Sequence, residues 1–228
     1  MAAQPDTGRE LSNAVQDYAK AIWMLAQRTR EPVPTSALAD RLGVSPASAS
    51  AMTGRLEALG LVTREPYKGV QLTPAGERVA LEVVRHHRLL ELYLAEALGM
   101  SWDRVHEEAE VLEHAISPEL SELIAAKLGN PTHDPHGDPI PTVNGELFEQ
   151  PTLPLAELHP GDRGTFVRVS DADPEMLRYL SGQGISPGDD FEVVEKQPFG
   201  GPLSVRFGER VQVLGGALTQ AMRTERQA

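Results

Sequence analysis

Hydrophobic and polar positions alternate with helical periodicity over the first 60 residues. Five apolar side chains spaced three or four residues apart predict a first helix over residues 9–28: Leu11, Val15, Tyr18, Ile22 and Leu25. Two shorter helices are predicted over residues 35–42 and 46–59, with Gly43 in the turn between them. Thr35 is expected to cap the first of these two helices. The other has a stronger start signal, with Ser45 as N-cap and Pro46 at the first helical position.

The remaining pattern predicts a hairpin, more helices and then a β-rich segment. Residues 61–64 and 70–72 are short strand candidates, and Thr73-Pro74 begins a long helix that ends at Gly99. Further helices are predicted over residues 101–116 and 118–129, followed by a proline-rich loop over 130–141. Short β-like runs at residues 164–169, 191–195, 203–207 and 211–214, with a helix near 174–180, indicate a small barrel. The expected fold is mainly α with small β parts.

Composition divides this pattern into three domains and narrows the setting. A chain of 228 residues with 40% hydrophobic residues can bury more than one core. We expect domains over residues 1–74, 75–150 and 151–228. No stretch is apolar enough to cross a bilayer, the N-terminal residues lack an export-signal core, and there is no cysteine. These features favour a reducing cytoplasm and exclude disulfides and thiolate metal sites.

Charge is distributed unevenly along the chain, whose formal net charge is −12. Residues 1–74 carry 8 Lys+Arg against 7 Asp+Glu, a net +1, and residues 151–228 carry 8 against 11, a net −3. Residues 75–150 carry 5 against 15, a net −10. The near-neutral first segment can still present a basic face to phosphates, whereas the acidic middle suits either a solvated helical surface or a cation site.

The order helix, glycine turn, helix and hairpin is that of a winged helix-turn-helix, whose second helix enters the DNA major groove. The start of that helix is small and hydroxylic, so base contacts are expected to depend partly on DNA shape. Arg55, Tyr67 and Lys68 are candidates for phosphate contacts. The predicted DNA-facing residues are Thr35, Ser45, Pro46, Ala47, Ser48, Ser50, Ala51, Arg55, Tyr67 and Lys68. The alternative is a protein-interaction module.

The acidic middle segment contains metal-ligand residue types at helical spacing. His106, Glu110, Glu113 and His114 fall at i, i+4, i+7 and i+8, which places them on one face of a helix. One helix cannot fill a coordination sphere, so other ligands must come from elsewhere. The preceding helix offers His87 and Glu91 at i and i+4, and the first helix offers Asp17. A single histidine or glutamate here would be an ordinary surface residue, but the coherent set favours a metal site.

Imidazole and carboxylate donors without sulfur suit Mn(II) or Fe(II). Of the metals to which such a protein could respond, manganese is the first choice, and iron(II) or zinc is the alternative. Zinc, cobalt(II) and cadmium are also expected to bind in vitro. His86 is expected to be a bystander, and His133 and His136, in the proline-rich loop, are expected to be structural. The zinc-protease motif His-Glu-x-x-His needs two histidines four residues apart, whereas His106 and His114 are eight residues apart. No other catalytic motif occurs, so we do not expect an enzyme.

These residues together resemble the diphtheria-toxin-repressor family of metalloregulators, and within it the manganese-sensing branch of three-domain type. The resemblance covers nearly the whole chain. Its specific segments are Tyr18–Trp23, the helix-turn-helix through Glu57, Leu72–Gly76, His87–Glu91, His106–His114, the loop Asp134–Pro141 and the C-terminal segment. It implies a winged helix-turn-helix, a helical dimerisation domain and a C-terminal Src-homology-3-like barrel of the kind found in ferrous-transport accessory proteins.

The resemblance also implies roles for particular residues. A regulatory metal site would use Asp17, Glu110, Glu113 and His114. A second site would use His87, Glu91 and His106 with a barrel ligand, Asp171 by first choice and Glu175 by second. Asp17 and Glu110 stand where iron sensors carry methionine and cysteine. Lys20 stands where shorter manganese sensors place a ligand glutamate, which argues against their closely spaced metal pair.

The family implies a homodimer that binds a palindromic operator, with one or two dimers per operator and no membrane partner. The expected function is therefore metal-dependent repression of transcription in response to Mn(II). The genes that the resemblance implies as targets are those for manganese uptake and homeostasis.

Overall fold

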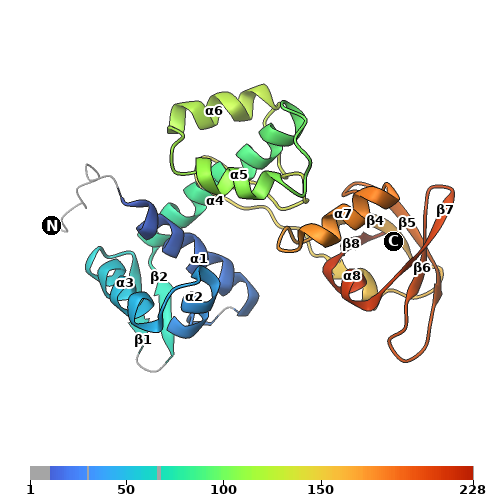
Figure 1. Ribbon diagram of the computed structural model, residues 1–228, viewed down its shortest axis with the longest axis horizontal. Coiled ribbons are helices and arrows are strands. Elements are labelled where there is room, and N and C mark those ends of the chain that lie inside the picture. The colour runs from blue at the N-terminus through green and yellow to red at the C-terminus, as the bar shows by residue number, and fades with distance from the viewer. Residues whose placement is uncertain (1–10, 30, 66–67, 228) are drawn as a thin grey trace. The chain divides into compact units, whose positions relative to one another are not determined.

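The computed structural model describes residues 11–29, 31–65 and 68–227 (Figure 1). In chain order the elements are α1 (Asn13–Thr29), α2 (Thr35–Leu42), α3 (Pro46–Ala58), β1 (Val62–Glu65), β2 (Gly69–Leu72), α4 (Pro74–Glu96), α5 (Val105–Leu112), α6 (Pro118–Lys127), β3 (Leu153–Pro154), η1 (Leu155–Glu157), β4 (Arg163–Arg168), α7 (Pro174–Gln183), β5 (Asp190–Lys196), β6 (Leu203–Phe207), β7 (Arg210–Leu214), α8 (Gly216–Ala221) and β8 (Arg223–Arg226). None of the helices in the described part of the chain is long and apolar enough to cross a membrane.

The chain forms two compact units. The first comprises Met1–His86 and Pro141–Gly145, and the second comprises His87–Ile140 and Glu146–Ala228. Helix α4 begins in the first unit and ends in the second. The helical segment and the β domain thus belong to one unit, and the predicted three-domain boundaries stay a prediction.

The first unit is a helix-turn-helix with a two-stranded wing. Helix α2 contacts α1 and α3, while β1 contacts α3 and β2 contacts α1. Leu38, Ala49 and Leu56 are fully buried in the core that these elements share. The strands pair antiparallel, with Val62 opposite Leu72. The predicted winged helix-turn-helix is therefore confirmed.

Side chains cap the starts of α3 and α4 but not that of α2. The hydroxyl of Ser45 accepts a hydrogen bond from the N–H of Ser48, as expected for the N-cap of α3. The hydroxyl of Thr73 likewise accepts from the N–H of Gly76 at the start of α4. The expectation that Thr35 caps α2 is wrong, because the N-cap is Pro34 and no side chain caps this helix.

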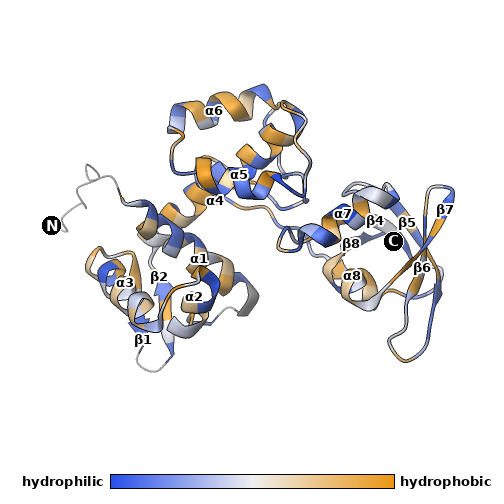
Figure 2. Ribbon diagram, viewed as in Figure 1, coloured by the Kyte–Doolittle hydropathy of each residue, from blue (hydrophilic) through white to orange (hydrophobic). Residues whose placement is uncertain are grey.

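The helical part of the second unit packs the end of α4 against α5 and α6 around Leu89, Leu92 and Ile124. Helix α5 is shorter than the predicted 101–116 segment. Its N-cap, Arg104, makes no side-chain capping bond, and its C-cap is Glu113. The sequence between Glu113 and Ser117, which caps α6, is a turn. Helix α6 carries both hydrophobic and polar residues (Figure 2), and its Leu120 and Leu123 are exposed.

The β part of the second unit is a six-stranded antiparallel sheet in the order β3-β8-β4-β5-β6-β7. Phe166, Leu180, Val193 and Leu214 are fully buried in its core. The pairing of β4 with β8 shifts register between Phe166 and Arg168, and such a bulge bends a strand locally. The predicted small β domain is confirmed. Strands β3 and β8 were not predicted, because they are short and form only by pairing with each other and with β4.

Candidate metal centre and nucleic-acid interface

Four side chains of the second unit converge on one point: His87 and Glu91 on α4, His106 on α5 and Asp171 after β4. Each offers one ligand atom, and these atoms all lie within 4.8 Å of one another. Nε2 of His87 lies 3.0 Å from Oε1 of Glu91, and Nδ1 of His106 lies 2.8 Å from Oδ2 of Asp171. Ligand atoms this close together could hold a single metal ion.

Local structure explains how the chain delivers these ligands. The i, i+4 spacing of His87 and Glu91 places both on one face of α4. Both are buried, and Glu91 is only 1% exposed. Asp171 lies in the turn before α7, whereas Glu175 is exposed in the first turn of α7. The structure therefore brings the first-choice barrel residue to the cluster and not the second.

The electrostatics of this cluster favour charged side chains. Burial alone would raise the pKa of Glu91, but hydrogen bonds from His106 and His87 outweigh it and lower that pKa. Burial also opposes ionisation of Asp171, whose pKa is nevertheless lowered by the hydrogen bond and the charge of His106. The hydrogen bond to Asp171, followed by that to Glu91, raises the pKa of His106 to about 10. In the metal-free cluster a proton on His106 therefore neutralises part of the buried acid.

Two imidazoles and two carboxylates fit a divalent cation of intermediate to hard character. A cation binding there would replace the His106 proton and meet donors that are already in place. All four donors are nitrogen or oxygen atoms, and the chain has no cysteine.

The residues predicted for a regulatory site lie partly next to this cluster. Nδ1 of His87 lies 2.5 Å from Oε2 of Glu113, and Oε1 of Glu113 lies 3.5 Å from Nε2 of His114. The half-exposed Glu110 places Oε1 3.8 Å from Nε2 of His106. Asp17 is half-buried on α1 and belongs to the first unit.

Two residues of the Asp134–Pro141 loop, Asp134 and His136, were missed as neighbours of the cluster. Each offers a ligand atom, and these atoms and one of Glu91 all lie within 4.8 Å of one another; all three residues are buried. The only available signal was an Asp and a His two residues apart in a loop otherwise rich in proline and glycine.

The predicted DNA-facing residues of α3 and its N-cap are all exposed: Ser45, Pro46, Ala47, Ser48, Ser50, Ala51 and Arg55. The small side chains of Ser45 and Ser48 lie at the helix start, and their hydroxyls share a hydrogen bond of 2.8 Å. Lys68 is exposed, and its Nζ lies 3.1 Å from Oε2 of Glu65. Thr35 is half-buried. Tyr67 lies outside the described residues.

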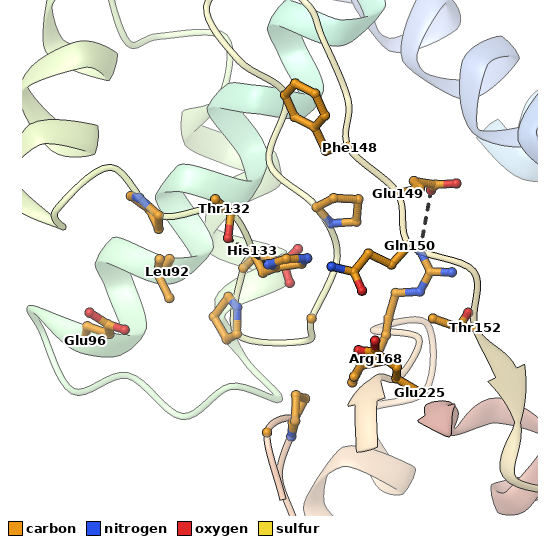
Figure 3. Close-up of a pocket in the computed structure, with 18 residues that line it drawn as sticks. Leu92, Glu96, Thr132, His133, Phe148, Glu149, Gln150, Thr152, Arg168 and Glu225 are labelled. Atoms are coloured by element: carbon orange, nitrogen blue, oxygen red, sulfur yellow. Dashed lines mark hydrogen bonds and ion pairs between the residues drawn. The ribbon is translucent and has the colours of Figure 1, made fainter. Parts of the chain in front are cut away.

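A separate cavity of about 570 Å³ lies beside the proline-rich loop (Figure 3). Its labelled walls include Leu92, His133 and Phe148, with an ion pair of 3.6 Å between Arg168 and Glu149. Its lining is mixed in charge and polarity, and it does not contain the four-ligand cluster.

Comparison with known proteins covers almost the whole chain. Residues 10–70 match the family described as "Iron dependent repressor, N-terminal DNA binding domain". Residues 73–142 match "Iron dependent repressor, metal binding and dimerisation domain", and residues 153–225 match the "FeoA domain".

Individual relatives agree with these matches. The chain is 28% identical to the diphtheria toxin repressor of Corynebacterium efficiens over 96% of this chain and 97% of that protein. It is 29% identical to the iron-dependent repressor IdeR of Mycobacterium tuberculosis, over 95% and 99% respectively.

Solved structures extend the comparison. A manganese-dependent transcriptional repressor in complex with manganese has a TM-score of 0.85 and 44% identity, over 93% of this chain and all of that one. The manganese regulator SloR has a TM-score of 0.72 and 28% identity, over 93% and 98%.

The helix-turn-helix, the helical domain and the β domain together define a metal-dependent transcriptional repressor rather than an enzyme. The chain belongs to the diphtheria toxin repressor family.

Proposed function

We propose that this chain represses transcription when Mn(II) is bound, and that it does so as a homodimer on a palindromic operator in the cytoplasm. The observation that carries the choice of metal is the donor set of His87, Glu91, His106 and Asp171, which contains only nitrogen and oxygen atoms. Such donors suit Mn(II) better than soft-ligand metals. The manganese-dependent repressor at 44% identity supports the same choice.

A second Mn(II) site is proposed from Asp17, Glu110, Glu113 and His114. This is the regulatory site, because it would tie helix α1 of the DNA-binding unit to the turn after α5. The bound ion supplies positive charge that lets clustered carboxylates approach one another. Asp17 and Glu110 give this site oxygen donors where a sulfur pair would select softer ions.

The dimer is proposed to form through the helical segment. Leu120 and Leu123 on α6 are 44% and 61% exposed, and Val111 on α5 is 73% exposed. Apolar side chains grouped on neighbouring helices commonly mark an association surface. Two copies of a recognition helix with little base-reading chemistry gain specificity from the fixed spacing of two half-sites.

Metal and operator are then linked in free energy. If Mn(II) favours the arrangement of the DNA-binding units that fits the operator, the operator must raise the affinity for Mn(II) by the same factor. The genes under control are proposed to be those for manganese uptake.

Electrophoretic retardation of operator DNA by the full chain, titrated separately with Mn(II), Fe(II) and Zn(II), tests the proposal. We expect Mn(II) to increase retardation, chelator to abolish it, and Asp17→Ala to remove the Mn(II) response. Glu107→Ala is the matched control, because Glu107 is exposed on α5 and outside both donor sets. Equal retardation in chelator would exclude metal dependence, and a response to Fe(II) or Zn(II) alone would exclude manganese.

A further inference from the structure

His136 in the loop between α6 and β3 is fully buried and touches three different segments of the second unit. Nε2 of its ring donates a hydrogen bond of 2.8 Å to the carbonyl oxygen of Trp102. Its own carbonyl oxygen accepts a hydrogen bond of 2.9 Å from the N–H of Val169. Nδ1 lies 3.9 Å from Oε2 of Glu91.

Each of these three segments supplies a ligand of the four-residue cluster. Glu91 is itself a member, Trp102 precedes His106 by four residues, and Val169 precedes Asp171 by two residues. A displacement of His136 would therefore be transmitted to ligands on α4, α5 and the β domain together. One buried residue outside the cluster contacts every segment from which the cluster is built.

The contact with Glu91 is made to the carboxylate oxygen that faces away from His87 and His106. Oε1 of Glu91 faces His87 and His106, while Oε2 faces Nδ1 of His136. Among the described residues Nδ1 has no hydrogen-bond partner, although it is buried. Buried polar atoms are normally paired. Because Nε2 already donates to Trp102, a proton on Nδ1 as well, with a shortening of about 1 Å, would complete a hydrogen bond to a metal-binding carboxylate.

The loop holds the His136 ring in this orientation. Oδ1 of Asp134 accepts hydrogen bonds from the N–H groups of His136 and Asp138, at 2.8 and 2.9 Å. The ring stacks on Trp102 with a centroid distance of 5.7 Å and an interplanar angle of 19°. Gly137 has φ +86°, and a Cβ there would lie 1.8 Å from the carbonyl oxygen of Val167. The loop therefore has little freedom to turn the imidazole away from Glu91.

A cation site of its own, formed by Glu91, Asp134 and His136, is the alternative use of this geometry. Charge argues against it, because the loop acids already have guanidinium partners. Arg88 lies 3.8 Å from Asp134 and 3.5 Å from Asp138, and Arg168 also lies 3.5 Å from Asp138. A further divalent ion would find the negative charge of the loop largely compensated.

We infer that His136 is a positioning residue that orients Glu91 and keeps Asp171 in reach of His106 for metal binding. The inference rests on the proposed function, since it takes the four-residue cluster as a metal site. Mutation of a residue that supports a metal ligand typically lowers metal affinity by about 10- to 100-fold.

The test compares His136→Phe with His133→Phe in the full chain carrying Asp17→Ala, which removes a ligand of the other proposed site. Phenylalanine retains the ring and its stacking but loses both nitrogens. His133 is the matched control because it is exposed in the same loop and, within the described part of the chain, its ring hydrogen-bonds to Thr132 alone. Mn(II) affinity is measured by titration calorimetry, Co(II) coordination by its visible absorption, and metal-free stability by thermal melting.

We expect His136→Phe to weaken Mn(II) binding by about 10- to 100-fold and to change the Co(II) spectrum, whereas His133→Phe changes neither. A third variant, His136→Asn, keeps a nitrogen donor on the Glu91 side and is expected to recover part of the affinity. Recovery without a gain in the metal-free melting temperature separates positioning from packing.

Three results would overturn the inference. The first is unchanged affinity and spectrum in His136→Phe. The second is an Asn variant that binds as weakly as the Phe variant. The third is loss of one whole metal equivalent with the remaining affinity intact, because that result would assign His136 to a separate site. Absence of metal binding in the Asp17→Ala parent chain would instead contradict the proposed four-residue site itself.

Discussion

The imidazole of His87 contacts both groups of proposed metal ligands. Its Nδ1 lies 2.5 Å from Oε2 of Glu113, while its Nε2 lies 3.0 Å from Oε1 of Glu91. A histidine that binds a metal through one nitrogen usually donates its other N–H to a carboxylate, which sets the tautomer and orients the ring. Binding at the four-residue cluster would therefore strengthen the hydrogen bond to Glu113, so this pair of residues links the two proposed sites.

Glu113→Gln should weaken metal binding at both proposed sites. The substitution removes a carboxylate ligand from the regulatory site. It also removes the negatively charged acceptor that orients His87 for metal binding at the four-residue cluster. We expect a loss of about 10-fold or more at the four-residue cluster, measured by Mn(II) calorimetry in the Asp17→Ala background. Glu110→Gln is the comparison, because Glu110 is half-exposed with Oε1 3.8 Å from Nε2 of His106, whereas Glu113 is buried and lies 2.5 Å from His87. Equal effects of the two substitutions on the cluster would contradict the shared role of His87.

Asp171→Ala should abolish tight binding at the four-residue cluster, while Glu175→Ala should not. Asp171 contacts His106 directly, and Glu175 is exposed on α7. Because the hydrogen bond to Asp171 is the largest cause of the raised His106 pKa, the same variant should lower that pKa. Calorimetry and a histidine NMR titration measure the two effects. A Glu175→Ala variant that loses more affinity than Asp171→Ala would reverse the ligand assignment.

Glu110→Cys should shift the metal that activates DNA binding from Mn(II) toward softer ions, because thiolates prefer such ions to Mn(II). The readout is operator retardation across Mn(II), Co(II), Zn(II) and Cd(II). Glu107→Cys adds the same thiol to the exposed side of α5 and is expected to leave the metal preference unchanged. An identical activation series in both variants would show that Glu110 is not a ligand.

Metal affinity at the four-residue cluster should rise with pH. The pKa of His106 is raised from 6.5 to about 10, so this ring is protonated at neutral pH and must release a proton when it binds a metal. One released proton makes the affinity rise about tenfold for each unit of pH below 10. Without metal, the protonated ring stabilises the fold fully below pH 6.5, and this contribution is lost as the pH rises through about 10.

The proton release can be counted by calorimetry in buffers of different ionisation enthalpy. A pH-independent affinity between pH 6.5 and 8.5 would contradict the raised pKa of His106. The Glu175→Ala variant provides the control, because Glu175 is exposed outside the cluster and its removal should leave the full pH dependence in place.

Much of the fold could be predicted because it depends on local physics. Helical periodicity, the Ser45 cap and the proline at position 46 determine α3 from its immediate neighbours. The spacing of His87 and Glu91 places both on one face of α4 whatever surrounds that helix. Helix α5 was predicted too long. The helical spacing of its side chains continues past Leu112, whereas the helix itself ends there and a turn begins at Glu113.

The sequence by itself determined the donor chemistry, because it contains no cysteine and carries its histidines and carboxylates at helical spacing. Tertiary structure decided which distant residues join them. Asp171 rather than Glu175 reaches His106, and His136 faces Glu91. Both contacts form because β4 packs closely against the loop at Gly137, which brings together segments that are far apart in sequence. Such contacts depend on packing between segments, which periodicity and spacing along the chain do not encode.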